Sequence, residues 1–249
     1  MGDSSLRRYR SGVGEANMAE LCTVEVDRVT LAYRVAGDPA DPPMVLLHGL
    51  GDDESDWGVV LPAFAGNYRV YALDLRGHGR SSHPGQYSFE LMRDDVVRFL
   101  EAVGVGRCVL VGHSMGGTVA LLFAQTAPHL LTHLILEDVT APRPGALKRP
   151  PLTPPETPTP FDFAAVNAIR AQINDPDPAW WDGIAMVGVP TLIIGGANST
   201  IPQYLLAETV ERMPDAELVT LDAGHYVHRD RPTEFIAAVD AFLTARTTP

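Results

Sequence analysis

Short apolar runs alternate along the chain with longer segments in which apolar residues recur every three or four positions. The runs from residue 44 onward hold few polar positions, which is typical of strands covered by helices on both faces. Segments with helical periodicity fill most of the intervals between them. We therefore predict an α/β fold with a mostly parallel, doubly wound sheet of about eight strands. The predicted strands are 22–27, 29–35, 44–49, 69–75, 107–113, 131–138, 191–196 and 217–223.

The first two predicted strands are joined at Asp27 and Arg28, a spacing that indicates a β-hairpin. We expect them to form the antiparallel edge of the sheet. Several predicted helices have Ser, Asp or Pro where they start, as helix N-termini prefer. These helices are 57–65, 88–103, 115–127, 202–213 and 232–246.

A proline-rich stretch interrupts the alternation. Residues 141–160 contain eight prolines, which exclude a helix or a central strand. A predicted helix follows at 161–174, and two further prolines lead back toward the next strand. We interpret 141–182 as a small cap over the carboxyl ends of the strands, where ligands bind in open α/β sheets. The alternative is a surface linker without a role, although long loops in compact domains are usually functional.

Composition limits the kind of partner. The chain has 45% hydrophobic and 20% charged residues with a formal net charge of -12, values that suit a globular domain and would repel a phosphate backbone. We expect a small, largely apolar substrate and no nucleic-acid or membrane partner. Two cysteines are too few for a disulfide framework, which favours a cytoplasmic location. Residues 1–20 lack the apolar core of a secretory signal, so we expect a disordered tail there and one domain over 21–249.

The clearest chemical signal is Gly112-His113-Ser114-Met115-Gly116, which matches G-x-S-x-G at a predicted strand-to-helix junction. Glycine on both sides of the serine permits a turn tight enough to expose the hydroxyl. The pattern predicts Ser114 as a nucleophile that attacks a carbonyl carbon. The alternative is an incidental serine in a turn.

A serine nucleophile needs backbone amides aimed at the oxyanion that develops on the carbonyl oxygen. The amide that follows the nucleophile belongs to Met115, and it is one expected donor. The second donor is expected from the loop after the third strand, where His48-Gly49-Leu50-Gly51 stands; we favour Leu50. His48 precedes the serine, against the chain order of this kind of site, so we interpret it as a residue that shapes the loop.

The general base is expected after the last strand. His225 follows an Ala-Gly turn and precedes a predicted helix, so its imidazole can reach toward Ser114. His228 is the competitor; because Arg229 and Asp230 adjoin it, we expect it to be solvated. A metal site at these histidines is disfavoured, because no third ligand accompanies them.

Four motifs, HGLG, DLRGHGRSS, GHSMGG and AGHYVHRDRP, occur in this order along the chain. Together they resemble the α/β-hydrolase superfamily from about residue 22 to 243. The resemblance implies a carboxylesterase-like enzyme with a Ser-His-acid triad and no cofactor. It also implies that the turn holding Asp74, Arg76, Gly77 and Gly79 is structural.

The acid departs from the commonest pattern of that family. Many relatives end the strand before the last with G-x-x-D, but this chain has Asn198 at that position. Some relatives take the acid from the end of the preceding strand, where Glu137 and Asp138 stand here. We assign the acid to Asp138. The alternatives are that these carboxylates only end the strand, and that Asn198 is a neutral orienter of the histidine, as in Cys-His-Asn enzymes.

Other polar and aromatic residues receive plainer interpretations. The acidic cluster in 51–57 is expected to cap the next helix and face solvent. No nucleotide-binding fingerprint is present. Six residues are candidates for an apolar acyl pocket, although aromatic residues are more often plain core; they are Trp57, Val139, Phe161, Phe163, Trp180 and Trp181.

These patterns together predict a serine hydrolase that cleaves an ester or related acyl or lactone bond through an acyl-enzyme. One alternative is a ligand-binding relative without catalysis, since one fold carries many functions. Another is C–C cleavage or acyl transfer by the same triad, which the sequence does not separate from ester hydrolysis.

Overall fold

The computed structural model describes residues 7–9, 19–145 and 148–246, and these contain one nine-stranded sheet in the order β1-β2-β3-β5-β4-β6-β7-β8-β9. All pairings among β4 to β9 are parallel, whereas β1, β2 and β3 pair antiparallel at one edge. The predicted mostly parallel α/β sheet is confirmed. The strands are β1 Arg7–Tyr9, β2 Glu20–Val26, β3 Val29–Ala36, β4 Pro43–Leu47, β5 Arg69–Leu73, β6 Cys108–His113, β7 Leu131–Glu137, β8 Thr191–Gly196 and β9 Ala216–Leu221.

β1 lies within the stretch predicted as a disordered tail, and for Arg7–Tyr9 that prediction is wrong. These residues pair antiparallel with Leu21–Thr23 of β2. An edge strand offers a row of unpaired backbone groups, so a short segment can add to it without an apolar pattern of its own. The rest of the predicted tail up to residue 18 lies outside the described residues.

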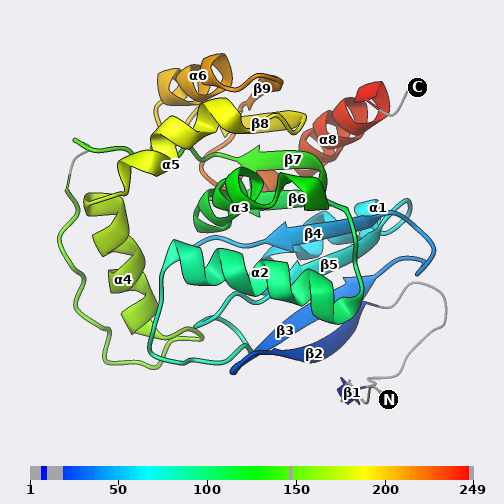
Figure 1. Ribbon diagram of the computed structural model, residues 1–249, viewed down its shortest axis with the longest axis vertical. Coiled ribbons are helices and arrows are strands. Elements are labelled where there is room, and N and C mark those ends of the chain that lie inside the picture. The colour runs from blue at the N-terminus through cyan, green and yellow to red at the C-terminus, as the bar shows by residue number, and fades with distance from the viewer. Residues whose placement is uncertain (1–6, 10–18, 146–147, 247–249) are drawn as a thin grey trace.

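Helices cover both faces of the sheet (Figure 1). α2 and α3 pack on one face together with Val45 and Leu47 of β4, and α1 and α8 pack on the other with Met44 and Leu46. Alternate residues of one strand thus enter two separate cores, which explains the continuous apolar runs. The helices are α1 Leu61–Phe64, α2 Phe89–Val103, α3 Met115–Thr126, α4 Phe163–Asn174, α5 Pro178–Asp182, α6 Gln203–Arg212, α7 Val227–Asp230 and α8 Pro232–Arg246, with 3-10 turns η1 Glu54–Val59, η2 Pro128–Leu130 and η3 Gly183–Met186.

The predicted helix 57–65 is instead split into η1 and α1. The division falls just before Pro62, which sits in the first turn of α1, where proline costs a helix no hydrogen bond.

The segment 141–182 runs past the carboxyl ends of the parallel strands, and α4 lies beyond the edge of the sheet toward which β4 points (Figure 1). Its residues Ile169 and Ile173 line the same cavity as Ser114, as a cap would require. In the described part of the chain, no helix is long and apolar enough to cross a membrane.

Candidate active site

Ser114 lies in the sharp turn between β6 and α3, with backbone angles φ 50 and ψ -111. Two glycines make the turn possible. A Cβ at Gly112 would meet the Gly116 carbonyl at 2.4 Å, and a Cβ at Gly116 would meet the Leu47 carbonyl at 2.3 Å. The Ser114 amide donates to the Glu137 carbonyl at 3.1 Å, so the end of β7 fixes the turn.

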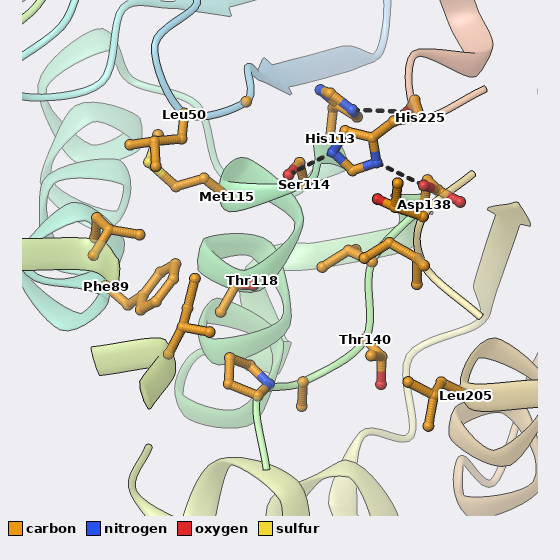
Figure 2. A pocket seen from close by; sticks show the side chains of 18 of the residues that line it. Leu50, Phe89, His113, Ser114, Met115, Thr118, Asp138, Thr140, Leu205 and His225 are labelled. Atoms are coloured by element: carbon orange, nitrogen blue, oxygen red, sulfur yellow. Dashed lines mark hydrogen bonds and ion pairs between the residues drawn. The ribbon is translucent and has the colours of Figure 1, made fainter. Parts of the chain in front are cut away.

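Ser114, His225 and Asp138 form one chain of hydrogen bonds at the carboxyl edge of the sheet (Figure 2). The Nε2 atom of His225 lies 2.9 Å from the Ser114 Oγ, and its Nδ1 lies 2.6 Å from the Asp138 Oδ2. With Nδ1 donating to the carboxylate, Nε2 is free to accept the serine proton. The arrangement is that of a nucleophile, a base and an orienting acid.

Asp138 is fully buried and held by several donors. Its amide donates to the Ile194 carbonyl at 2.8 Å. Its Oδ1 accepts from the Gly196 amide at 3.0 Å, and its Oδ2 accepts from the Ser199 hydroxyl. The end of β8 therefore supports the acid without supplying it. The contact of Ser199 with Asp138 could not be predicted from the sequence, because Ser199 belongs to no motif.

Asn198 does not lie against the histidine. Its Nδ2 donates to the Asp222 Oδ1 at 2.8 Å, and its amide donates to the Ala223 carbonyl at 2.9 Å. The geometry therefore brings Asp138 to His225 and leaves Asn198, the alternative orienter, in the turn beside β9.

Leu50 and Met115 both line the cavity that contains Ser114 and are labelled in Figure 2. Met115 is the first residue of α3, where a backbone amide has no partner within the helix. The helix dipole adds a partial positive charge at this point. The Met115 amide is thus suited to donating a hydrogen bond to an oxyanion.

His48 holds the loop that presents Leu50. Its buried ring lies with Nδ1 2.7 Å from the Gly49 carbonyl, and its Nε2 accepts from the Leu75 amide at 3.0 Å. Its own carbonyl accepts from the Gly116 amide at 3.1 Å. These contacts fit the loop-shaping interpretation, because they connect the loop after β4 to the chain beyond β5 and to the start of α3.

The turn after β5 makes structural contacts. Asp74 accepts from the amides of Glu54 and Arg80 at 2.6 and 2.7 Å. Arg76 forms a two-pronged ion pair with Asp95 of α2. Neither side chain lines the cavity.

The cavity that contains Ser114 has a volume of about 400 Å³, within the usual range for small-molecule sites. It extends from the serine past Thr118 toward Phe89 on one side and Leu205 on the other (Figure 2). Its apolar lining includes Leu50, Phe89, Met115, Val139, Ile169, Ile173, Ile201 and Leu205.

Of the six predicted pocket residues only Val139 lines this cavity, and the five aromatic residues do not. Trp57 is fully buried with α1 and α8. Trp180 packs edge-on behind Phe89, with ring centroids 5.5 Å apart, and Trp181 lies under two arginine side chains. Phe161 stacks on Phe163 and on His78. The three tryptophans are buried core residues, whereas Phe161 and Phe163 are half-buried. The large surfaces of all five found partners in neighbouring elements instead of a ligand.

The prediction that His228 is solvated is wrong. Its ring has no exposed surface and lies between Glu137 and Asp56. The acidic cluster of 51–57 is likewise only partly as predicted. Asp53 caps η1 by accepting from the Ser55 amide, but Glu54 and Asp56 are buried. Burial is possible because cations from other segments compensate these carboxylates, among them Arg34, whose guanidinium binds Glu54.

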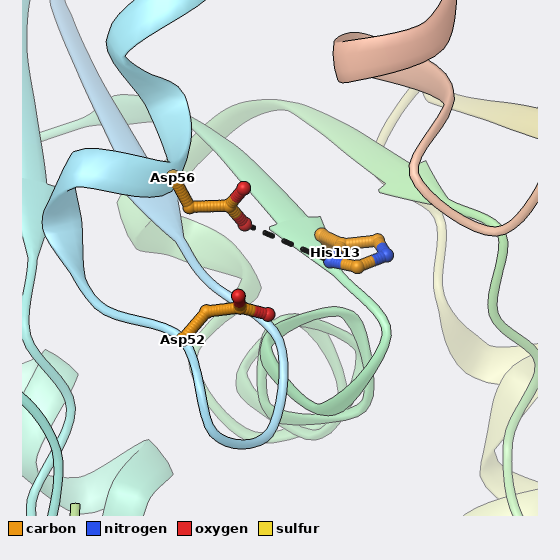
Figure 3. A group of neighbouring side chains, drawn as sticks. All are labelled: Asp52, Asp56 and His113. Atoms are coloured by element: carbon orange, nitrogen blue, oxygen red, sulfur yellow. Dashed lines mark ion pairs between the residues drawn. The ribbon is translucent and has the colours of Figure 1, made fainter. Parts of the chain in front are cut away.

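Asp52, Asp56 and His113 form a cluster behind the turn that holds Ser114 (Figure 3). The His113 Nδ1 lies 3.9 Å from the Asp56 Oδ2. One imidazole and two carboxylates match the donors that zinc accepts. Both carboxylates are nevertheless already paired with Arg229, and Asp56 also with His228. We assign no metal to this cluster, because its charge is compensated by the protein.

The fold agrees with what comparison with known proteins finds. A family model described as alpha/beta hydrolase fold matches residues 42–165. A hydrolase from Pseudomonas aeruginosa has a similar structure, with a TM-score of 0.78 and 27% identity over 90% of this chain and 98% of its own. This chain belongs to the α/β-hydrolase superfamily.

Relatives with named activities are hydrolases of more than one kind. The sn-1-specific diacylglycerol lipase ABHD11 of Mus musculus is 29% identical over 86% of this chain and 85% of its own length. Epoxide hydrolase 3 of Xenopus tropicalis is 40% identical, but the match spans 46% of this chain and 31% of the frog protein. These likenesses support hydrolase activity without fixing the bond that is cleaved.

Proposed function

We propose that this protein hydrolyses carboxylic esters of small, largely apolar molecules through a covalent acyl-enzyme. The observation that carries the proposal is the continuous hydrogen-bonded chain from the Ser114 hydroxyl through the His225 ring to the Asp138 carboxylate. It is the constellation that activates serine as a nucleophile on several unrelated folds.

In the proposed acylation, the Ser114 Oγ attacks the ester carbonyl while its proton passes to the His225 Nε2. Asp138 keeps the Nδ1 proton in place and stabilises the imidazolium that forms. The amides of Leu50 and Met115 would bind the negative oxygen of the tetrahedral intermediate. Its collapse expels the alcohol, which takes the proton from the Nε2.

In the proposed deacylation, a water molecule gives a proton to the same Nε2 and attacks the acyl carbon. The second intermediate collapses to the free acid and returns the proton to Ser114. All groups that the two half-reactions require come from this chain, and we propose no cofactor.

The aliphatic part of the cavity lining supports an apolar acyl or alcohol group, and Arg143 and Arg149 line another part of the cavity. Its walls combine aliphatic side chains from the cap, such as Ile169 and Ile173, with Leu205 of α6. A buried apolar group gains about 25 cal/mol for each Å² removed from water, so affinity should rise with chain length until the cavity is filled.

The test is a series of nitrophenyl esters of increasing acyl length, with monoacyl and diacyl glycerols added because of the mouse relative's name. A fluorophosphonate probe is run beside it to report the nucleophile. We expect turnover of at least one ester class and labelling of wild type but not of Ser114→Ala. Labelling that persists in Ser114→Ala would exclude Ser114, and absence of both labelling and turnover would favour the non-catalytic relative.

A further inference from the structure

His228 is one of the fully buried ionisable groups near the proposed site, and the catalytic scheme above does not use it. It lies in α7, three residues after His225, and has no exposed surface. Its backbone amide and both of its ring nitrogens are engaged by carboxylates. A buried titratable group with this many partners is either structural or part of the site's electrostatics.

The two ring nitrogens face two different acids. Nδ1 lies 2.8 and 2.7 Å from the two carboxylate oxygens of Glu137, and Nε2 lies 2.9 Å from the Asp56 Oδ1. An ionised carboxylate only accepts hydrogen bonds, whereas neutral imidazole has a single N–H. Both contacts are therefore satisfied only when His228 is an imidazolium. A neutral ring would set a lone pair against a carboxylate.

The surroundings favour that charge. The indole of Trp57 stacks on the ring with centroids 4.4 Å apart, a cation–π arrangement. The carboxylates outweigh burial, which alone would lower the value, and raise the pKa of His228 to about 9. The charged or titratable groups that face this ring or its partners are Glu137 on β7, Asp56 on η1, Arg229 on α7, Tyr226 just before α7, His113 at the end of β6 and Asp52 in the loop after β4.

Each partner of His228 adjoins a different part of the site. Glu137 immediately precedes Asp138, and its carbonyl accepts from the Ser114 amide. Asp56 lies in η1, the segment that follows the Leu50 loop. His228 itself anchors the turn that carries His225. Glu137 is the last residue of β7, Asp138 follows it with a left-handed backbone angle φ of 47, and the two carboxylates bind different histidines.

We propose that His228 is a positioning residue. Its imidazolium donates hydrogen bonds to two carboxylates and so connects the turn that carries His225 to the strand end that holds Asp138 and to the segment after the Leu50 loop. It acts through the geometry of these three segments and does not touch the substrate. Losing it loosens the His225 to Ser114 contact in the transition state, where small displacements matter most.

This inference rests on the proposed serine chemistry, and the test separates the two. The variants are His228→Gln, Glu137→Gln, and His129→Gln as a control at an exposed histidine. For each, kcat and KM are measured with one ester, the fluorophosphonate labelling rate is measured at saturating probe, and folding is checked by circular dichroism. Wild type is also examined by nitrogen NMR of its histidine rings at neutral pH.

We expect His228→Gln to lower kcat and the labelling rate by about 10- to 100-fold, with KM nearly unchanged and His129→Gln like wild type. Glu137→Gln removes one charge, so its kcat should fall at a lower pH than that of wild type as His228 loses its proton. In the NMR spectrum, both ring nitrogens of His228 should be protonated. If His228→Gln fails to fold, Glu137→Gln and the NMR spectrum still decide.

A folded His228→Gln that labels as fast as wild type, or a neutral His228 ring in the NMR spectrum, would overturn the inference. The inference would also be overturned if kcat of Glu137→Gln falls at the same alkaline pH as kcat of wild type. Wild type that is neither labelled nor active refutes the proposed function instead, and the ring protonation then still tests the imidazolium.

Discussion

Raising the pH should remove the proton that His228 holds between two carboxylates, and with it part of the free energy of unfolding. The pKa of this group is raised from 6.5 to about 9 by Glu137 and Asp56. Between these values the folded state binds one proton more than the unfolded state, so stability falls as pH rises. The contribution is fully present below about pH 6.5 and is lost once the pH has passed through about 9.

Each pH unit in this window lowers the free energy of unfolding by about 1.4 kcal/mol. The whole shift therefore corresponds to about 3 kcal/mol, because the fully buried ring is shielded from solvent screening. For a chain of this length, that corresponds to roughly 6 to 12 °C in melting temperature. The loss should be monotonic across the window.

The assay is urea unfolding of wild type and His228→Gln at several pH values from about 6 to about 10. Groups that titrate in both proteins cancel in the difference between them. The excess stability of wild type should shrink by about 3 kcal/mol across this range. A difference that stays constant with pH would refute the argument that a buried imidazolium bridges the two acids.

Four further outcomes are expected. Ser114→Ala should lose kcat by on the order of 10⁶-fold and keep its melting temperature, as ester turnover and thermal unfolding would report. Asp138→Asn should lose kcat by about 10⁴-fold whereas Asn198→Ala stays near wild type, and the reverse ranking in parallel ester assays would remove Asp138 from the triad. Ile173→Trp should fill the cavity and lower kcat/KM for long acyl chains by at least about tenfold relative to short ones, and an unchanged ratio would mean that the chain binds elsewhere. Dialysis against EDTA should change neither turnover nor melting temperature, because Arg229 and His228 already compensate Asp52 and Asp56; loss of either, restored by zinc, would contradict this.

The sheet, the long helices and the position of Ser114 could be predicted from the sequence, because their signals are local. Apolar runs, helix caps and glycines around a serine act over a few residues. Ser88, for example, caps α2 as its position suggests, accepting from the Leu91 amide at 3.1 Å. The choice of Asp138 over Asn198 required family resemblance, since both stand at strand ends.

The burial of His228 and the role of Trp57 could not be predicted in this way. The carboxylates that keep the His228 charge inside the protein lie 91 and 172 positions away in the chain. Its sequence neighbours Arg229 and Asp230 indicate solvent, and only the tertiary fold supplies the partners that offset the cost of burial. The assignment of five aromatic residues to the pocket was wrong for a related reason, because an aromatic residue in the sequence does not say which element it packs against.

Because the proposed acid stands at the end of β7, the loop after β8 does not have to supply it. Because Asp138 binds His225, the loop after β8 has only Ser199 bound to the acid, and the next three residues, Thr200–Pro202, form cavity wall. Substitutions at these wall positions can therefore reshape substrate preference without moving the proton relay. A directed-evolution library confined to residues 200–202 would test new substrates from a background in which the proposed nucleophile, base and acid stay intact.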